Sequence, residues 1–524
     1  MRTSPVPSRH LAGLVALLAA WAMPSARVVA QQPYGPATAG SAGITPQLHA
    51  VRPRPGDAAF QFELTQAVGG SPAFLVLGTG VGSLPVLGIE LLVDPATILL
   101  AFGSTTSPGG AGVGAASFPL PIPATPSLTG LALFAQGVVV DVGTTFGFSS
   151  SRGLRFSVTN TPAVFVATSI LNNDPFHLID PLAGTILDSG SPPQVDNASG
   201  AVFDQSGARI FTASGIRGIV GVGDLSSLPI SWSTLYASPA SSVYGLQLDD
   251  SRQLLWTLTA LFGGSRELVA IDVDRNSPGY GTAVHSTNGM LVGNAELWAM
   301  APSRDLAAVM TFLPNSITIV DTDPQSPTFL QNRFTQLPIP VDQAGPIALA
   351  TRVAITPDER WALVTLQGVG TTPTEIARLD LRTGNWFDHN PGQFGTNIGP
   401  FGATPLTLGS APTTLLISAS GRFAIVGGFG ACGWVGRLDL DPTDPLNVGF
   451  TPFQPGVTLA NGWTSAMAPD EREIAVATWP SANCALASPQ LVRIDVATGA
   501  LLSTIAIPPN SNGSNQNLYT VVYR

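Results

Sequence analysis

Hydrophobic and polar residues alternate along the first part of the chain with the period of a β-strand. Within Phe60–Thr65 every second residue is apolar, and the glycine-rich turn Gly69–Pro72 follows. Such alternation indicates a half-buried strand that ends at a turn. Segments of the same kind follow at Ala73–Leu77, Gly88–Val93, Thr97–Phe102 and Leu131–Asp141. Residues 31–159 lack helical spacing, so we predict a small all-β domain there, a sandwich or a barrel.

From residue 160 onward a different unit repeats. Each copy has an apolar strand, a short polar turn and a second apolar strand, as in Val353–Thr356, Pro357–Arg360 and Trp361–Leu366. The six turns are Asp204–Gly207, Asp249–Arg252, Pro302–Asp305, Pro357–Arg360, Ser418–Gly421 and Pro469–Arg472. A period of about 40–60 residues is typical of a propeller or an array.

A second marker in each unit is a strand that ends in aspartate. There are seven of these: Asp180, Asp224, Asp272, Asp321, Asp380, Asp439 and Asp495. The copy with Asp180 lacks a first strand, whereas Leu518–Arg524 is a last strand without partners. Joining the two completes a seventh unit and removes an open edge. We therefore predict a seven-bladed β-propeller over residues 160–524, closed by the C-terminal strand.

The regular aspartates have a structural explanation. They stand just before turn residues, where a carboxylate can accept hydrogen bonds from the backbone N–H groups of the turn. We expect them to stabilise turns. Asp272–Asn276 has the oxygen spacing of a calcium loop but lacks the glycine and glutamate that complete such a loop, so we expect no metal.

The motif Val492–Gly499, VRIDVATG, resembles the propellers of the YVTN and lactonase-like superfamily. The resemblance covers about residues 160–524 and implies the propeller fold, with lactonase-type hydrolysis in the central channel as one possible activity. Residues 31–159 resemble a small β module appended to large secreted bacterial proteins, through Tyr34-Gly35, Leu77-Gly78, Leu128–Gly130 and Ser151–Leu154. That module implies no chemistry.

The N-terminus and the composition bear on where the protein is located and on which partners and chemistry are excluded. Residues 1–30 have a basic start, a short apolar run and small residues at Val28–Ala30, which predicts a secretory signal, with an uncleaved anchor as the alternative. No later segment has the length and apolarity of a membrane span, so we expect a secreted monomer, extracellular or periplasmic. The net charge of −10 argues against a nucleic-acid partner. With no lysine in the chain, Schiff-base and phosphate-loop lysines are excluded.

Candidate catalytic groups are scarce in the sequence. It contains neither a Gly-x-Ser-x-Gly elbow nor a His-Glu-x-x-His pair, and its few histidines are scattered. We expect no cofactor. Cys432 and Cys484 are predicted to form one disulfide, and two unrelated buried thiols are the alternative.

Long connections of blades four to seven predict a binding face. They are Asp323–Ala350, Arg382–Pro412, Gly368–Thr374, Gly427–Gly433 and Trp479–Pro489. Long loops on a rigid scaffold commonly carry binding. Six residues are candidates to line the channel mouth on this face: Tyr244, Trp298, Arg352, Phe394, Phe401 and Trp463. The alternative is that they pack between blades. We expect a binding scaffold for a protein or small ligand, with the hydrolase as the alternative.

Overall fold

The computed structural model describes most of the chain from residue 31 to its end. The described part excludes residues 1–30, 51–52, 54, 56, 58–59, 107–109, 124, 126–127, 129–130, 159–162, 169–175, 191–197, 205–206, 216, 226–227, 240–241, 261–265, 289–290, 292–294, 313–314, 340–348, 368–374, 387–411, 429–432, 441–447, 458, 460–463, 479–487 and 509–517.

The N-terminal part forms two facing antiparallel sheets and a hairpin. One sheet has the order β1-β11-β9-β4-β7 with β10 beside β9, the second has the order β2-β3-β8, and β5 pairs with β6. The strands are β1 Gln31–Tyr34, β2 Gln47–Ala50, β3 Gln61–Gly69, β4 Pro72–Gly78, β5 Val81–Val86, β6 Ile89–Val93, β7 Ile98–Thr105, β8 Gly110–Pro119, β9 Ala132–Val140, β10 Phe148–Ser150 and β11 Gly153–Ser157; the 3-10 turns are η1 Ser41–Gly43 and η2 Pro95–Thr97. We call this part the N-terminal sandwich.

The core of the N-terminal sandwich follows from the alternation in β3. Phe62 and Leu64 are fully buried and pack with residues of the facing sheet such as Leu75 and Phe156. The rings of Phe62 and Phe156 lie edge to face with centroids 5.2 Å apart. The polar residues between them on β3, Glu63 and Thr65, therefore face away from this core.

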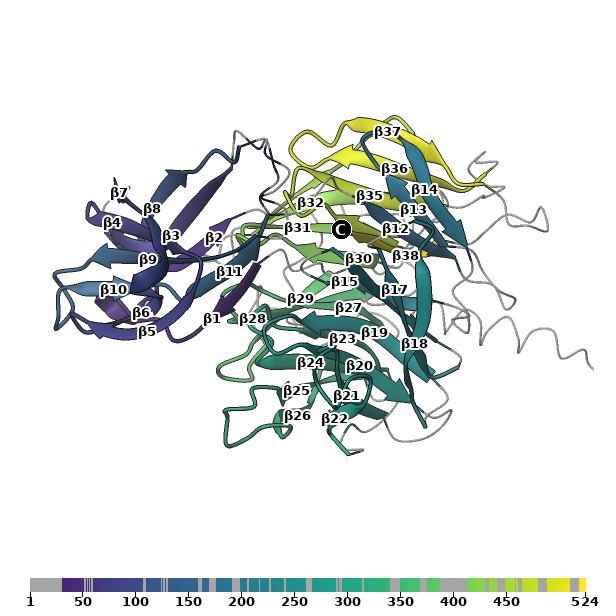
Figure 1. Cartoon of the computed structure of the whole chain (residues 1–524), viewed down its shortest axis with the longest axis horizontal. Helices are drawn as coiled ribbons and strands as arrows, with labels where there is room; N and C mark the ends of the chain where they lie inside the picture. Colours follow the sequence, from purple (N-terminus) through teal and green to yellow (C-terminus); the bar gives the residue numbers. More distant parts are fainter. Residues whose placement is uncertain are drawn as a thin grey trace, which may run out of the picture.

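The remainder of the chain forms seven sheets in chain order, which are the blades of the propeller (Figure 1). Blade one has the order β14-β13-β12-β38, and the others follow as β15–β18, β19–β22, β23–β26, β27–β29, β30–β33 and β34–β37. Their strands are β12 Val164–Thr168, β13 Phe176–Asp180, β14 Thr185–Gly190, β15 Ala198–Phe203, β16 Arg209–Ser214, β17 Ile219–Asp224, β18 Ser231–Ala237, β19 Ser242–Asp249, β20 Leu254–Ala260, β21 Arg266–Asp272, β22 Ala283–Ser286, β23 Ala295–Met300, β24 Leu306–Phe312, β25 Asn315–Asp321, β26 Asn332–Pro338, β27 Leu349–Ile355, β28 Trp361–Gln367, β29 Glu375–Asp380, β30 Pro412–Ile417, β31 Phe423–Gly428, β32 Trp434–Leu440, β33 Val448–Pro452, β34 Thr464–Met467, β35 Glu473–Thr478, β36 Gln490–Asp495, β37 Leu501–Ala506 and β38 Leu518–Tyr523.

The all-β propeller class predicted from the sequence is confirmed. The last strand of the chain, β38, pairs antiparallel with β12, the first strand of the repeat, with Val522 opposite Phe165. The described part of blade five has three strands, and a single bridge between Leu379 and Trp386 follows them. Apolar clusters fill the spaces between successive blades.

The seven aspartates end the third strand of each blade or stand one residue before its end. Five accept hydrogen bonds from backbone N–H groups of the following turn, namely Asp180, Asp272, Asp321, Asp380 and Asp495. The described partners of the other two are arginines, and the turn residues 226–227 and 441–447 lie outside the described part of the chain: Asp224 lies 2.9 Å from Arg275 Nη2, and Asp439 lies 2.7 Å from Arg437 Nε.

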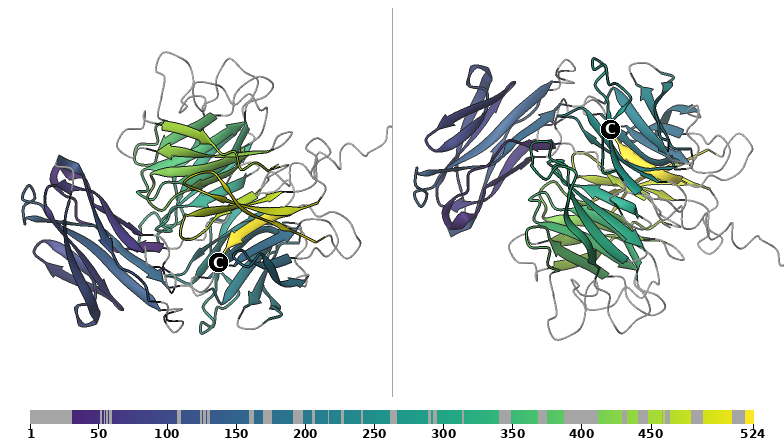
Figure 2. Two further views of the ribbon diagram at one scale, coloured as in Figure 1. Left: turned by 90° about the horizontal axis from the view of Figure 1, so that it is seen from above. Right: turned by 90° about the horizontal axis from the view of Figure 1, so that it is seen from below.

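The N-terminal sandwich lies against one face of the propeller (Figures 1 and 2). Ion pairs and hydrogen bonds between described residues link the two parts. Arg152 Nη2 lies 3.4 Å from Asp305 and its Nη1 3.7 Å from Glu359. Arg155 Nη1 donates to the carbonyl oxygen of Asp250 over 3.5 Å, and Arg472 lies 3.5 Å from Asp57. The propeller groups come from the turns between the first and second strands of the blades.

Several sequence predictions concern residues outside the described part of the chain. These are the signal at residues 1–30, the disulfide between Cys432 and Cys484, the candidate residues Phe394, Phe401 and Trp463, and most of the long-loop rim. They stay predictions. Within the described residues, no helix is both long and apolar enough to cross a membrane.

Candidate ligand site between the sandwich and the propeller

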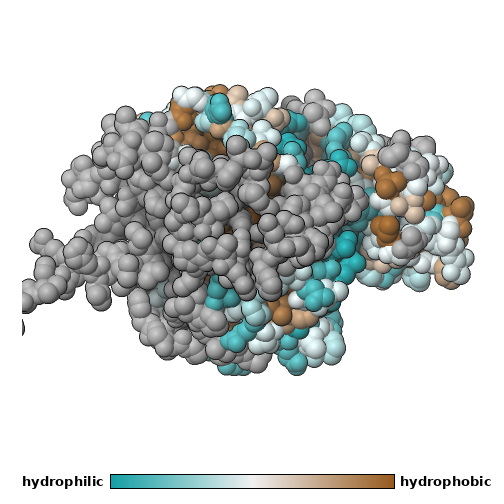
Figure 3. All heavy atoms as spheres, turned by 180° about the vertical axis from the view of Figure 1, so that it is seen from behind, coloured by the Kyte–Doolittle hydropathy of each residue, from teal (hydrophilic) through white to brown (hydrophobic). Residues whose placement is uncertain are grey.

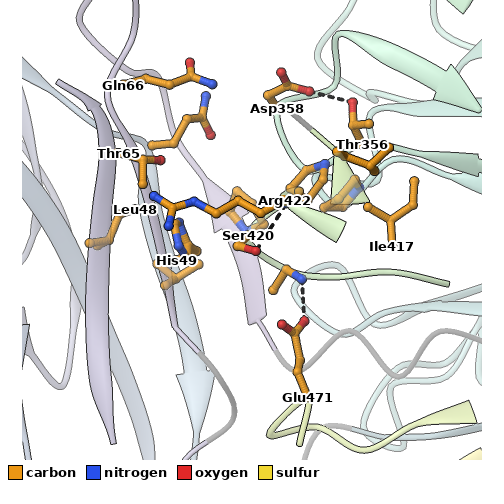
Figure 4. Close-up of a pocket in the computed structure, with 18 of the residues that line it drawn as sticks. Leu48, His49, Thr65, Gln66, Thr356, Asp358, Ile417, Ser420, Arg422 and Glu471 are labelled. Carbon is orange, nitrogen blue, oxygen red and sulfur yellow. Dashed lines mark hydrogen bonds between the residues drawn. The ribbon is translucent and has the colours of Figure 1, made fainter. Parts of the chain in front are cut away.

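A cavity of about 320 Å³ lies where the N-terminal sandwich meets the propeller (Figure 4). Its volume falls at the lower end of the range of about 300–1,000 Å³ that is usual for small-molecule sites. Both parts of the molecule line it, so it exists only in their assembled form. We call it the interdomain cavity.

One wall comes from the sheet β2-β3-β8. Because Leu64 points into the sandwich core, its neighbour Thr65 on β3 points toward the propeller, and Gln47 of β2 lies opposite Thr65 in the register. The pairing of β3 with β8 shifts between Leu64 and Ala67, and Gln66 adopts a left-handed backbone with φ 56°. A bulge of this kind re-aims a side chain, and Gln66 faces the cavity (Figure 4).

The opposite wall comes from three equivalent turns of the propeller. These are the turns between the first and second strands of blades five, six and seven, which contribute Asp358, Ser420 and Glu471 respectively. The floor is apolar, with Leu416, Ile417 and Met467 among its residues. The repeated turn found in the sequence thus supplies one side of the site three times.

Most polar groups of the propeller wall are held by the turns themselves. Asp358 Oδ1 accepts from Thr356 Oγ1 at 2.5 Å and from Arg360 N at 3.1 Å. Glu471 Oε1 accepts from the backbone N–H of Ala419 in the neighbouring blade. These hydrogen bonds fix the geometry of the turns, and in each of them a carboxylate oxygen accepts from a donor of the protein.

A histidine and a carboxylate pair on the sandwich wall. His49 Nε2 lies 3.0 Å from Glu63 Oε2. This hydrogen bond lowers the pKa of Glu63, and the nearby guanidinium of Arg422 contributes to the same shift. Arg422 extends from blade six toward the sandwich and ends near His49 and Thr65 (Figure 4).

The predicted channel-mouth residues that the structure describes lie elsewhere. Trp298 is buried, and its Nε1 donates to the carbonyl oxygen of Tyr244 over 2.9 Å. The Arg266 guanidinium covers the ring of Tyr244 at 5.3 Å. Arg352 is buried, which lowers its pKa to about 9, and it donates to the Thr351 carbonyl oxygen over 2.6 Å. Tyr244 and Trp298 share one hydrophobic cluster, which favours the packing alternative.

The inner strands enclose a much smaller space. Trp298 and Arg352 line a cavity of about 20 Å³ together with Gln247 and apolar residues of neighbouring strands. Its described lining contains no histidine, aspartate or glutamate that could act as a general acid or base. Across the described residues, no group of three metal-ligating side chains occurs.

The interdomain cavity lies on the face opposite the predicted rim. Because adjacent strands are antiparallel, turns between first and second strands lie at the other end of a blade from connections between second and third strands. The sequence revealed the repeated turns, but which of them contact the sandwich depends on how the two parts dock. No local sequence pattern indicates that Thr65 and Ser420 line the same cavity.

Comparison with known proteins finds solved structures whose fold is similar to that of this chain. No protein-family model and no curated protein matches the chain. A periplasmic gluconolactonase from Pseudomonas aeruginosa is 13% identical with a TM-score of 0.48, over 68% of this chain and 98% of its own. A functionally unknown protein from Desulfotomaculum acetoxidans is 13% identical with a TM-score of 0.47, over 68% and 98%. At these values the likeness says nothing about activity, and the chain is described as an all-β propeller with an N-terminal sandwich.

Proposed function

We propose that this protein is an exported binding protein that holds a small molecule in the interdomain cavity. The observation that carries the proposal is the cavity itself: about 320 Å³, with an apolar floor and polar side chains from two walls. An apolar pocket with a few convergent polar groups is the usual form of a small-molecule site. Export rests on the signal-like residues 1–30.

The construction of the walls supports recognition more than catalysis. The propeller wall is made of turns braced by their own hydrogen bonds, so its groups need little reorganisation when a ligand enters. The sandwich wall sits on strands of a sheet. A site on rigid elements limits the entropy lost on binding.

A fragment screen by ligand-observed NMR tests the proposal. We expect fragments that bind the wild type, and we expect Thr65→Trp and Ala115→Trp to weaken them at least tenfold, because both residues line the cavity and an indole would fill it. Ser117→Trp is the matched control, since Ser117 is exposed on the same strand and lies outside the cavity lining. Fragments that bind all four proteins equally would contradict the proposal.

Lactonase-type hydrolysis is the second candidate, and the His49–Glu63 pair favours it. A carboxylate that orients a histidine is a common arrangement for a general base. The test is hydrolysis of simple aliphatic lactones by the wild type and by His49→Gln at equal concentration. Turnover that His49→Gln abolishes would support the hydrolase, and equal rates for both proteins and buffer would exclude it.

A further inference from the structure

Four polar side chains of the interdomain cavity have unused hydrogen-bonding capacity. Gln47, Thr65 and Gln66 on the sandwich and Arg422 on the propeller line the cavity. Among the described residues, their side chains make no hydrogen bond and no ion pair within 4 Å; the bond that Arg422 makes to Ser420 comes from its backbone N–H. All four are at least partly accessible, so water solvates them in the free protein.

The set is dominated by hydrogen-bond donors. A guanidinium offers five N–H donors and each amide offers two, whereas the acceptors are two amide oxygens and one hydroxyl. In Figure 4 the Arg422 side chain extends from the propeller toward Thr65, and Gln66 lies on the same sandwich wall as Thr65. A ligand that satisfies them needs oxygen acceptors at this end.

Among the described charged groups that line the cavity, Arg422 has no direct ion-pair partner within 4 Å, although its charge acts on Glu63. Asp358 accepts from donors of its own turn, Glu471 accepts from the backbone N–H of Ala419 in the neighbouring blade, and Glu63 is paired with His49. Arg378, the other cation of the lining, lies over the Trp361 ring at 5.3 Å. Arg422 is therefore the cation of the lining that is available to a ligand, and its planar fork matches a carboxylate in a bidentate manner.

We propose that the ligand of the interdomain cavity carries a single carboxylate, bound by Arg422 and the amides of Gln47 and Gln66, with an apolar body on the floor formed by Leu416, Ile417 and Met467. This inference rests on the proposed binding function. A monoanion fits better than a phosphate dianion, because Asp358 and Glu471 also line the cavity and would repel a second negative charge. The apolar floor excludes a ligand that is polar throughout.

Matched pairs of small probes test the charge of the ligand directly. Hexanoate is compared with hexanamide, and benzoate with benzamide, by saturation-transfer NMR and calorimetric titration on the full chain. We expect each carboxylate to bind at least tenfold more tightly than its amide, and we expect Arg422→Gln to remove that preference. Arg382→Gln is the control, because Arg382 is exposed on a turn outside the cavity lining.

The outcomes distinguish a failure of the carboxylate inference from a failure of the proposed binding function. Equal affinity of acid and amide, lost in Thr65→Trp, would overturn the carboxylate while the cavity remains a binding site. A carboxylate preference that survives in Arg422→Gln would overturn the role of Arg422. Failure of all four probes and of every fragment to bind would overturn both proposals.

Discussion

Tyr523 links the last strand of the propeller to the blade beside it through a buried polar chain. Its hydroxyl donates to Glu473 Oε1 at 2.9 Å, and the other oxygen of Glu473 accepts from Arg493. Arg493 in turn donates to the Pro181 carbonyl oxygen in blade one. Burial, followed by the charge of Glu473, raises the pKa of Tyr523, so the hydroxyl remains a donor at ordinary pH.

Replacing Tyr523 by phenylalanine tests how much the hydrogen bond from its hydroxyl contributes to stability. We expect Tyr523→Phe to lower the free energy of unfolding by about 1–3 kcal/mol, because a buried acceptor loses its donor. Urea unfolding followed by tryptophan fluorescence measures this free energy for the propeller, since every tryptophan after residue 30 lies in the propeller sequence. Tyr236→Phe is the control, because its hydroxyl makes no hydrogen bond to a described residue. Equal losses in both variants would contradict the assignment.

Glu359 provides a pH-dependent test of the contact between the two parts. Burial raises its pKa above the unfolded value of 4.5, whereas the charge of Arg152 acts in the opposite direction. A raised folded pKa means that ionisation of Glu359 costs stability once the pH rises above the unfolded value. Arg152 and the backbone N–H of Ser303, which donates over 2.8 Å, reduce this cost.

We therefore expect Arg152→Gln to destabilise the protein more at pH 7.5 than at pH 4.5, because the raised pKa of Glu359 leaves less of its charge to be balanced at the lower pH. Thermal midpoints across this range measure the effect. In the Glu359→Gln background the loss caused by Arg152→Gln should become independent of pH, because the contacts of Arg152 with Asp305 and with the Gly35 carbonyl oxygen remain. A pH-dependent loss that persists without Glu359 would show that another group is responsible.

Among the strands and turns, local sequence determines much of the observed structure. The strand alternation around Phe62 and the turn at Pro357 act within a few residues, so a single sequence reveals them. Asp224 and Asp439 also pair with arginines: Arg275 is distant in sequence, so no local pattern reveals it, whereas Arg437 is two residues away on the same strand face.

The β38 strand is the element on which blade one depends. Without residues 518–524, β12 would lose its inner partner and expose an unpaired strand edge, and Val522 would leave the cluster it shares with Phe165. We expect this truncation to lower the thermal midpoint and to produce aggregates, which scattering and size-exclusion chromatography would detect. Unchanged stability and a single monomer peak would contradict the pairing.

At the scale of the whole molecule, the site depends on docking that the sequence does not encode locally. Thr65 and Ser420 are separated by more than half of the chain, yet they line the same cavity. The predicted rim relied on loop length, a feature that locates exposed segments but not the face where a second domain docks. The propeller could therefore be predicted from its repeats, whereas the cavity required the arrangement of both parts.

Ligand binding in the interdomain cavity requires both of its walls, and a comparison of dissociation constants shows whether it does. The dissociation constant of the strongest-binding fragment is determined for the wild type, for Thr65→Trp on the sandwich wall and for Ser420→Trp on the propeller wall, with Ser117→Trp as control. Both wall variants should weaken binding at least tenfold while their thermal midpoints stay near that of the wild type. Binding that either wall variant leaves unchanged would show that the ligand binds elsewhere.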